Sequence, residues 1–333
     1  MPTVLESLSS MINPDVVGSL GKIFNAEPAA VSRGIGAVGP LILGSMNKIA
    51  STPAGAESLL KALPADGGAS VLGGFGNIGN LIGSLTGNSS QNNMLASLIG
   101  PGINAISGSL SKALGFNVTP LISLAAPTVM GLVSKAVQSG KLNAGGLASM
   151  LSRETADYKA NPANKESLAL VNTAIAAGDQ AATIIKGYGE DWTKVAAAPV
   201  AALLAVSTAD LDGPFDTIKE IKAAQAASLE IAKSAPAGSL LSAALGGGLT
   251  KSALTSVKEM AKNPDSLIRL IADATASVKK RSPGEVDAFR GAIRSIGKAT
   301  AEAAKEGGFF GIGGTLVSDD EKAALQKIEQ ALA

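Results

Sequence analysis

Apolar residues recur every three to four positions along the second half of the chain, which is the spacing of one face of an α-helix. Three such stripes are clear, and each indicates a helix with one face to bury. They are Leu267, Ile271, Ala274 and Val278; Val286, Phe289, Ile293 and Ile296; and Leu325, Ile328 and Leu332. Strand signals are weak, because β-branched runs are short and aromatic residues make up 3% of the chain. The pattern predicts an all-α protein whose second half is a bundle of roughly six to eight helices.

A second local signal marks where helices begin. A polar capping residue followed by proline suits a helix start, because the side chain accepts from a free N–H and proline fits the first helical position. Ser282 with Glu285, and Ser318 with Glu321, also have the spacing of a capping box. The cap-proline pair occurs at Asn13-Pro14, Thr52-Pro53, Thr119-Pro120, Asn161-Pro162, Asn263-Pro264 and Ser282-Pro283.

The first half contains an internal repeat. GSLGK at 18–22 leads to PLILGSMNK at 40–48, and GSLSK at 108–112 leads to PTVMGLVSK at 127–135. In both copies the later segment reads P-x-aliphatic-x-G-x-x-x-K, which predicts a short helix opened by proline, with a glycine that allows close backbone approach. The repeat predicts two related helical hairpins packed together around a Gly-rich middle.

That middle is unusual because Gly67–Ser111 contains 45 consecutive residues without Asp, Glu, Lys or Arg. A water-exposed segment normally carries charge, so this one is expected to be buried, paired with another chain, or a neutral loop.

The charge pattern also divides the chain. Residues 1–150 hold 5 acids and 7 bases of the 27 and 28 in the whole chain, so we expect two helical domains, 1–150 and 151–333.

The chain has no cysteine and no histidine, which removes thiol nucleophiles, the commonest general base and the commonest transition-metal ligand. A non-enzymatic protein without a cofactor is therefore expected. Neither half has the positive excess that nucleic-acid binding requires.

The N-terminus does not resemble a signal peptide. Val195–Val206 is too short to span a bilayer, and the prolines in Ala113–Ser134 predict two short buried helices there. A cytoplasmic protein is expected.

The paired proline-aliphatic-glycine segments at Pro40 and Pro127, with the Gly-rich stretch from Gly67 to Gly87, resemble the YidB-like family of bacterial proteins of unknown function. The resemblance covers about residues 1–150 and implies a helical fold but no activity. Around Ala209, the sequence ADLDGPFDTIKE is similar to the acidic helix-turn segment of TerB-like tellurite-resistance domains. In that pattern an acid follows the second Asp by three residues, whereas here the acid comes one position later.

The TerB-like segment contains the best candidate metal ligands, Asp210, Asp212, Asp216 and Glu220. Such oxygen ligands can hold Ca2+ or Mg2+ without histidine. The spacing does not fit an EF-hand loop, and the alternative is that Asp210 or Asp212 caps the next helix while the others lie on its wet face.

Several glycine motifs have alternative interpretations. G-x-G-x-x-G occurs at 34–39 and 74–79, but neither match follows a predicted strand, so helix-packing or loop glycines are expected rather than a dinucleotide site. Phe309, Phe310 and Ile312 lie in a Gly-rich uncharged stretch that fits intrachain packing, insertion into a neighbouring pocket, or a membrane surface.

Together these features predict a structural or interaction protein that acts by self-association or by assembly with a protein partner. The alternatives are a stress-response module that binds a divalent cation, and a peripheral membrane protein that does not span the bilayer. The residues expected at the interface are Ile78, Leu81, Ile82, Leu85, Phe309, Phe310 and Ile312.

Overall fold

The fold was taken from a computed structural model, which describes residues 3–65, 100–209, 214–249, 257–303 and 317–333, without the side chains of 214–218. These residues form helices and turns with no strand among them, so the predicted all-α class is confirmed. The chain divides into two compact units, Met1–Ala177 and Gly178–Ala333. The domain boundary expected between residues 150 and 151 stays a prediction.

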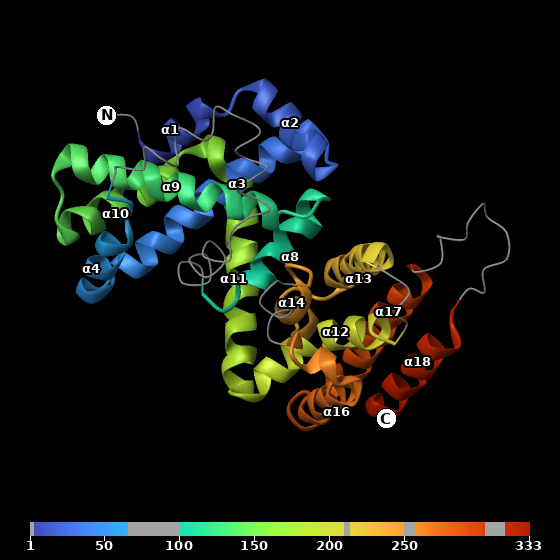
Figure 1. Cartoon of the computed structure of the whole chain (residues 1–333). Helices are drawn as coiled ribbons and strands as arrows, with labels where there is room; N and C mark the ends of the chain where they lie inside the picture. Colours follow the sequence, from blue (N-terminus) through green and yellow to red (C-terminus); the bar gives the residue numbers. More distant parts are fainter. Residues whose placement is uncertain (1–2, 66–99, 210–213, 250–256, 304–316) are drawn as a thin grey trace. The chain divides into compact units, whose positions relative to one another are not determined.

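The first unit is organised around helix α3, which contacts α1, α2, α4, α8, α9 and α10 (Figure 1). The buried face of α3 includes Val31, Val38 and Met46, each fully covered. The described helices of this unit are α1 (Val4–Met11), α2 (Pro14–Phe24), α3 (Pro28–Ala50), α4 (Pro53–Ala62), α8 (Ile103–Leu114), α9 (Thr119–Gly140), α10 (Ala144–Ala160), the 3₁₀ turn η1 (Pro162–Asn164) and the first part of α11 (Lys165–Tyr188).

The two copies of the sequence repeat form the helix pairs α2–α3 and α8–α9. The long helices α3 and α9 pack on each other, and Phe24, at the end of α2, stacks on Phe116, just after α8, with ring centroids 6.1 Å apart. Each short helix ends at a residue with positive φ, Asn25 at 48° and Gly115 at 82°. The repeat therefore buries its apolar surface against its own second copy.

Pro40 and Pro127 do not open helices, which corrects the sequence prediction. Both lie inside long helices, α3 and α9, which begin at Pro28 and Thr119. Likewise, Ala113–Ser134 is not a pair of short helices, because α9 runs unbroken through Pro127. A proline in a helix removes one backbone hydrogen bond, and the apolar burial of α3 and α9 offsets that loss.

The first G-x-G-x-x-G segment lies in α3, and its glycines mark close packing, as predicted. A Cβ at Gly34 would lie 3.0 Å from Leu121 Cδ2, and one at Gly39 would lie 2.7 Å from Leu8 Cδ2. The small residues thus let α9 and α1 approach the backbone of α3. The second match, at 74–79, lies outside the described residues.

Among the described residues, three helical segments are long and apolar enough to cross a membrane by length and composition alone. In the folded chain the apolar window is 56% buried in Pro28–Ala50, 72% buried in Thr119–Gly140 and 28% buried in Pro162–Tyr188.

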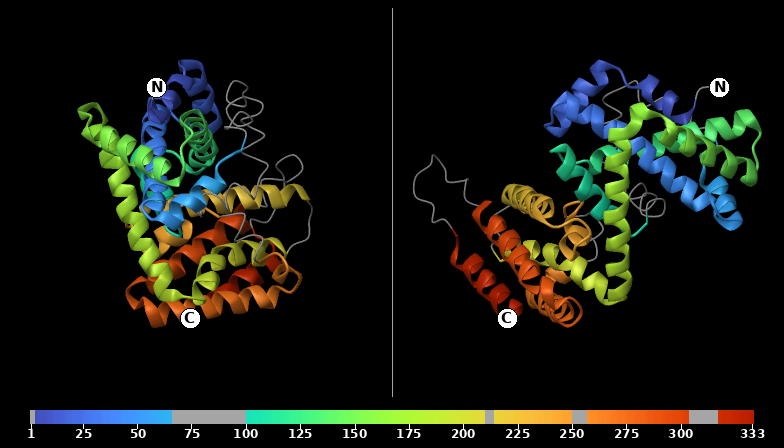
Figure 2. Two further views of the ribbon diagram at one scale, coloured as in Figure 1. Left: turned by 90° about the vertical axis from the view of Figure 1, so that its left-hand side faces the viewer. Right: turned by 180° about the vertical axis from the view of Figure 1, so that it is seen from behind.

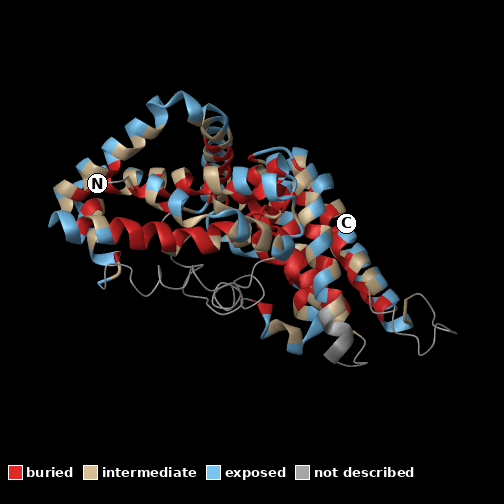
Figure 3. Cartoon of the chain, turned by 90° about the horizontal axis from the view of Figure 1, so that it is seen from above, coloured by how far each residue is buried: buried red, intermediate tan, exposed pale blue. Residues whose placement is uncertain are grey.

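The second unit is built around α12, which contacts α13, α14, α16, α17 and α18 (Figures 1 and 2). The three predicted apolar stripes face its core: Ile271, Phe289 and Leu332 are each fully buried. Figure 3 shows the same division of buried inner and exposed outer faces along the helices. The described elements after α11 are α12 (Asp191–Ser207), α13 (Pro214–Ser234), α14 (Leu240–Leu245), η2 (Met260–Lys262), α16 (Pro264–Arg281), η3 (Pro283–Glu285), α17 (Val286–Ala303) and α18 (Asp319–Leu332).

Candidate functional site

The predicted acidic cluster is only partly described. Asp210 and Asp212 lie outside the described residues, as does the side chain of Asp216, whose backbone belongs to α13. Glu220, on the same helix, is buried with 5% of its surface exposed, so it does not lie on a wet face. Among the described residues, no group of three or more Asp, Glu, His or Cys side chains could hold a metal ion. Binding of Ca2+ or Mg2+ stays a prediction that calorimetric titration would test.

The residues predicted at an interface also lie outside the described part of the chain. This applies to Ile78, Leu81, Ile82 and Leu85 in the neutral segment, and to Phe309, Phe310 and Ile312 near the C-terminus. Self-association through these residues therefore stays a prediction.

A cavity in the first unit is lined in part by Pro40, the proline inside α3. Pro40 has no N–H, so the carbonyl of Gly36, four residues earlier, lacks its usual helical donor. The hydroxyl of Tyr158 on α10 donates to that carbonyl at 3.2 Å. Burial raises the pKa of Tyr158, while a hydrogen bond with Ser167 opposes the shift. The phenol therefore stays protonated at neutral pH and remains a donor.

A second tether holds α1 beside the same part of α10. Both carboxylate oxygens of Glu154 accept from the backbone N–H of Val4 at 2.9 Å, which satisfies a donor at the start of α1. Burial raises the pKa of Glu154, the Val4 N–H lowers it, and the negative charges of Glu6 and Asp157 raise it further. Leu5, adjacent to the tethered residue, is thereby placed on the edge of the cavity.

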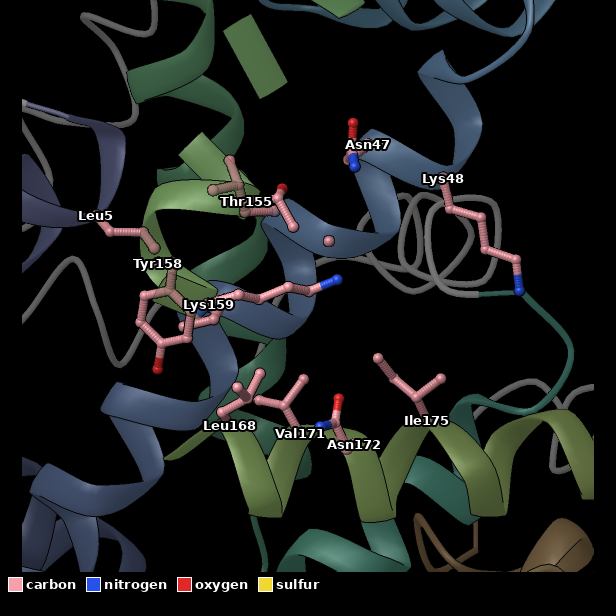
Figure 4. A pocket seen from close by; sticks show the side chains of 13 residues that line it. Leu5, Asn47, Lys48, Thr155, Tyr158, Lys159, Leu168, Val171, Asn172 and Ile175 are labelled. Atoms are coloured by element: carbon pink, nitrogen blue, oxygen red, sulfur yellow. The ribbon is translucent and has the colours of Figure 1, made fainter. Parts of the chain in front are cut away.

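The cavity has a volume of about 240 Å³ and lies where α1, α3, α10 and the first part of α11 meet (Figure 4). Its apolar wall comes from Leu5, Pro40, Leu43, Leu168, Val171 and Ile175. Its polar groups are Asn47, Lys48, Thr155, Tyr158, Lys159 and Asn172. Figure 4 shows Lys159 extending from α10 into the middle of the view, while the Asn172 amide points upward from α11. This combination of an apolar wall with a few polar groups is typical of a small-molecule site.

Tyr158 also lines a neighbouring cavity of about 290 Å³, which shares Leu5 and Pro40 with the first. The position of its ring therefore sets the shape of both cavities. Sequence reasoning missed Tyr158 and Lys159, because the polar stretch around them resembles an ordinary solvated helix end. Pro40 within an apolar helix is the one local signal that a carbonyl needs an outside donor.

Replacing Tyr158 with phenylalanine is expected to lower the free energy of unfolding by about 1 kcal/mol, because the Gly36 carbonyl loses its donor. Pro40→Ala restores an N–H to the helix, so the cost of Tyr158→Phe should become much smaller in that background. A double-mutant cycle from chemical denaturation measures this coupling. Equal costs in the two backgrounds would contradict the pairing of the hydroxyl with the freed carbonyl.

A second polar cluster, in the other unit, joins three helices. Arg281 donates to the carboxylate of Asp191 at 3.0 Å and to the carbonyl of Gly187 at 2.8 Å, and its guanidinium lies 5.8 Å from the centre of the Tyr188 ring. The hydrogen bond from Arg281 lowers the pKa of Asp191. Trp192 packs edge-on against Tyr188. Because these groups satisfy one another, they fasten α16 to the end of α11 and the start of α12.

The protein is all-helical where the structure describes it, and in its first unit the two copies of the sequence repeat pack against each other. Residues 6–136 match the family model of a bacterial protein of unknown function, DUF937, and this segment belongs to that family. DUF937 is the family of YidB, so the YidB-like resemblance is confirmed. The matched segment supplies the α3 wall of the cavity but ends before α10 and α11. The TerB-like resemblance, outside it, stays a prediction. No curated protein and no solved structure matches the chain.

Proposed function

We propose that this chain is a non-enzymatic protein that acts by association, in the first place with copies of itself. The observation that carries the proposal is the uncharged segment Gly67–Ser111, 45 residues long and rich in glycine and aliphatic side chains. The end of this segment belongs to α8, where Ala105, Ile106 and Leu110 are already buried within the first unit. Burying the rest of the segment against a partner chain would remove apolar area from water, at about 25 cal/mol per Å² before the costs of association.

The packing of the first unit supports this proposal. Its two repeat copies associate within one chain, through α3 against α9 and through Phe24 against Phe116. The two copies meet through apolar and small side chains, which is the chemistry that we propose for a contact between chains. A contact of this kind needs no reactive side chain, which fits a chain without cysteine or histidine.

Replacing Ile78 and Ile82 together with aspartate is expected to break the assembly into monomers of 33.0 kDa. Two carboxylates in an apolar interface would have to be desolvated without partners, which costs several kcal/mol. Light scattering coupled to size exclusion, over a concentration series, measures the molar mass of the wild type and the variant.

The matched control replaces Ile23 and Ile221 with aspartate, since each is 38% exposed in the described structure. That variant makes the same chemical change outside the proposed interface and should keep the wild-type mass. A wild type that stays at 33.0 kDa at every concentration, or an Ile78 and Ile82 variant with unchanged mass, would overturn the proposal.

The second candidate is a peripheral membrane protein, favoured by the incomplete burial of the long apolar segment Pro162–Tyr188, at 28% of its apolar window. Flotation with liposomes separates the two candidates, because an assembly without membrane affinity stays in the soluble fraction. The cytoplasmic location predicted from the sequence belongs to the first candidate and is part of the same proposal.

A further inference from the structure

The charged side chains among the described residues that line the cavity in the first unit are both lysines. They are Lys48 and Lys159, and none of the described lining residues is a carboxylate. The acids of the adjoining helix ends, Glu154 and Asp157, are not among the lining residues, and Glu154 already accepts from the backbone of Val4. A ligand in this cavity therefore meets the Lys159 ammonium, which extends into the middle of the view in Figure 4, and the amides of Asn47 and Asn172.

The rest of the lining is apolar and leaves space beside α3. Leu43, Leu168, Val171 and Ile175 form the wall, and a Cβ added at Gly44 would meet no atom within 4 Å. The cavity of about 240 Å³ holds roughly eight waters by their share of liquid volume. It is smaller than the 300–1,000 Å³ typical of drug-sized ligands, so the ligand must be small.

We propose that this cavity binds a small monocarboxylate with an unbranched apolar chain, of the medium-chain fatty acid class. The carboxylate lies between the Lys159 ammonium and the Asn172 amide, which extend toward the cavity from α10 and α11 (Figure 4). The chain lies along the leucine, valine and isoleucine wall beside Gly44. A charge-assisted hydrogen bond fixes one end, and methylene burial supplies the remaining affinity.

This site is separate from the proposed self-association, because its lining residues lie outside the neutral segment and outside the other residues predicted at the interface. The family-matched segment supplies Lys48 and Gly44, whereas Lys159 and Asn172 come from helices beyond it. Fatty-acid binding would thus depend on the whole first unit.

Isothermal titration calorimetry on the full chain, with octanoate, octanol and octylamine below micellar concentrations, tests the proposal. Octanoate is expected to bind at one site, at least about tenfold more tightly than octylamine, because the Lys159 ammonium attracts the carboxylate and repels the protonated amine. Affinity should rise roughly fourfold for each methylene from hexanoate to octanoate.

Four variants locate the binding site. Lys159→Gln should weaken octanoate about tenfold and leave octanol unchanged, whereas Lys165→Gln, the matched control at an exposed lysine outside the lining, should change neither. Gly44→Leu should fill the cavity and abolish binding. If Gly44→Leu does not fold, Asn172→Leu at an exposed lining position serves instead and should weaken octanoate more than octanol.

Four results would overturn the assignment. The first three are the absence of saturable heat with octanoate at millimolar concentration, equal affinity for octanoate and octylamine, and wild-type affinity in a folded Gly44→Leu or in Asn172→Leu. The fourth is a loss of affinity in Lys165→Gln equal to that in Lys159→Gln, because the attraction would then be a general effect of surface charge. The acyl chain could also come from a membrane phospholipid. Neutral phospholipid vesicles added to the titration test this, and they should not compete with octanoate for the cavity.

Discussion

Replacing Phe289 with alanine is expected to lower the free energy of unfolding of the second unit by about 3–5 kcal/mol. The Phe289 side chain is fully buried on α17, which packs against α12 and α13. Removing the ring loses its transfer energy and leaves a cavity that the neighbouring helices close only in part. Urea unfolding followed by far-ultraviolet circular dichroism measures the loss.

Two further variants show whether the loss comes from the missing volume. Phe289→Leu keeps much of the side chain and should cost less than half as much as Phe289→Ala. Asp287→Ala, on the same helix with 94% of its side chain exposed, should stay within about 0.5 kcal/mol of the wild type. A Phe289→Ala protein as stable as the wild type would mean that this face of α17 is not buried.

Local chemistry predicted many helix starts correctly. Asn13, Thr52 and Asn263 each accept a hydrogen bond from the first turn of the helix they precede, and Ser318 with Glu321 forms the expected capping box. These signals work because the partners lie within four residues of one another, so tertiary contacts need not supply them.

Prediction failed where distant contacts replaced local ones. Ser282 and Glu285 have capping-box spacing, yet the Ser282 hydroxyl accepts from the Tyr188 hydroxyl at 2.9 Å, and Glu285 accepts from the backbone of Leu240 at 2.8 Å. Pro40 was expected to open a helix, but α3 continues through it, and Tyr158 supplies the missing donor. In each case the decisive partner lies more than 40 residues away in the sequence.

The cavity could not be predicted for the same reason. Its lining joins Leu5, the middle of α3, the end of α10 and the first part of α11, and no local pattern indicates that these segments meet. The residues that sequence reasoning selected instead, the aliphatics of the neutral segment and most of the acidic cluster, lie outside the described part of the chain. Composition identifies unusual segments well, but a binding site depends on which segments the fold brings together.

Replacing Gly55 with alanine is expected to destabilise the first unit by about 1–3 kcal/mol, although glycine to alanine inside a helix usually stabilises by about 0.5–1 kcal/mol. Gly55 lies in the first turn of α4, where its N–H donates to the Thr52 hydroxyl at 3.1 Å. A Cβ at Gly55 would lie 2.0 Å from the backbone carbonyl oxygen of Ile49 at the end of α3. Because that atom belongs to the backbone, only a shift of the α3–α4 turn can make room. Thermal unfolding followed by circular dichroism measures the change.

Gly18→Ala in α2 is the matched control, since a Cβ at Gly18 would meet no atom within 4 Å. The same substitution there should raise the free energy of unfolding by up to about 1 kcal/mol, because alanine loses less backbone entropy on folding. The pair thus predicts opposite signs for one chemical change in two helices of the same unit. If both variants were stabilised, the turn between α3 and α4 would have to be wider than the structure has it, and α4 would be held against α3 by its apolar face alone.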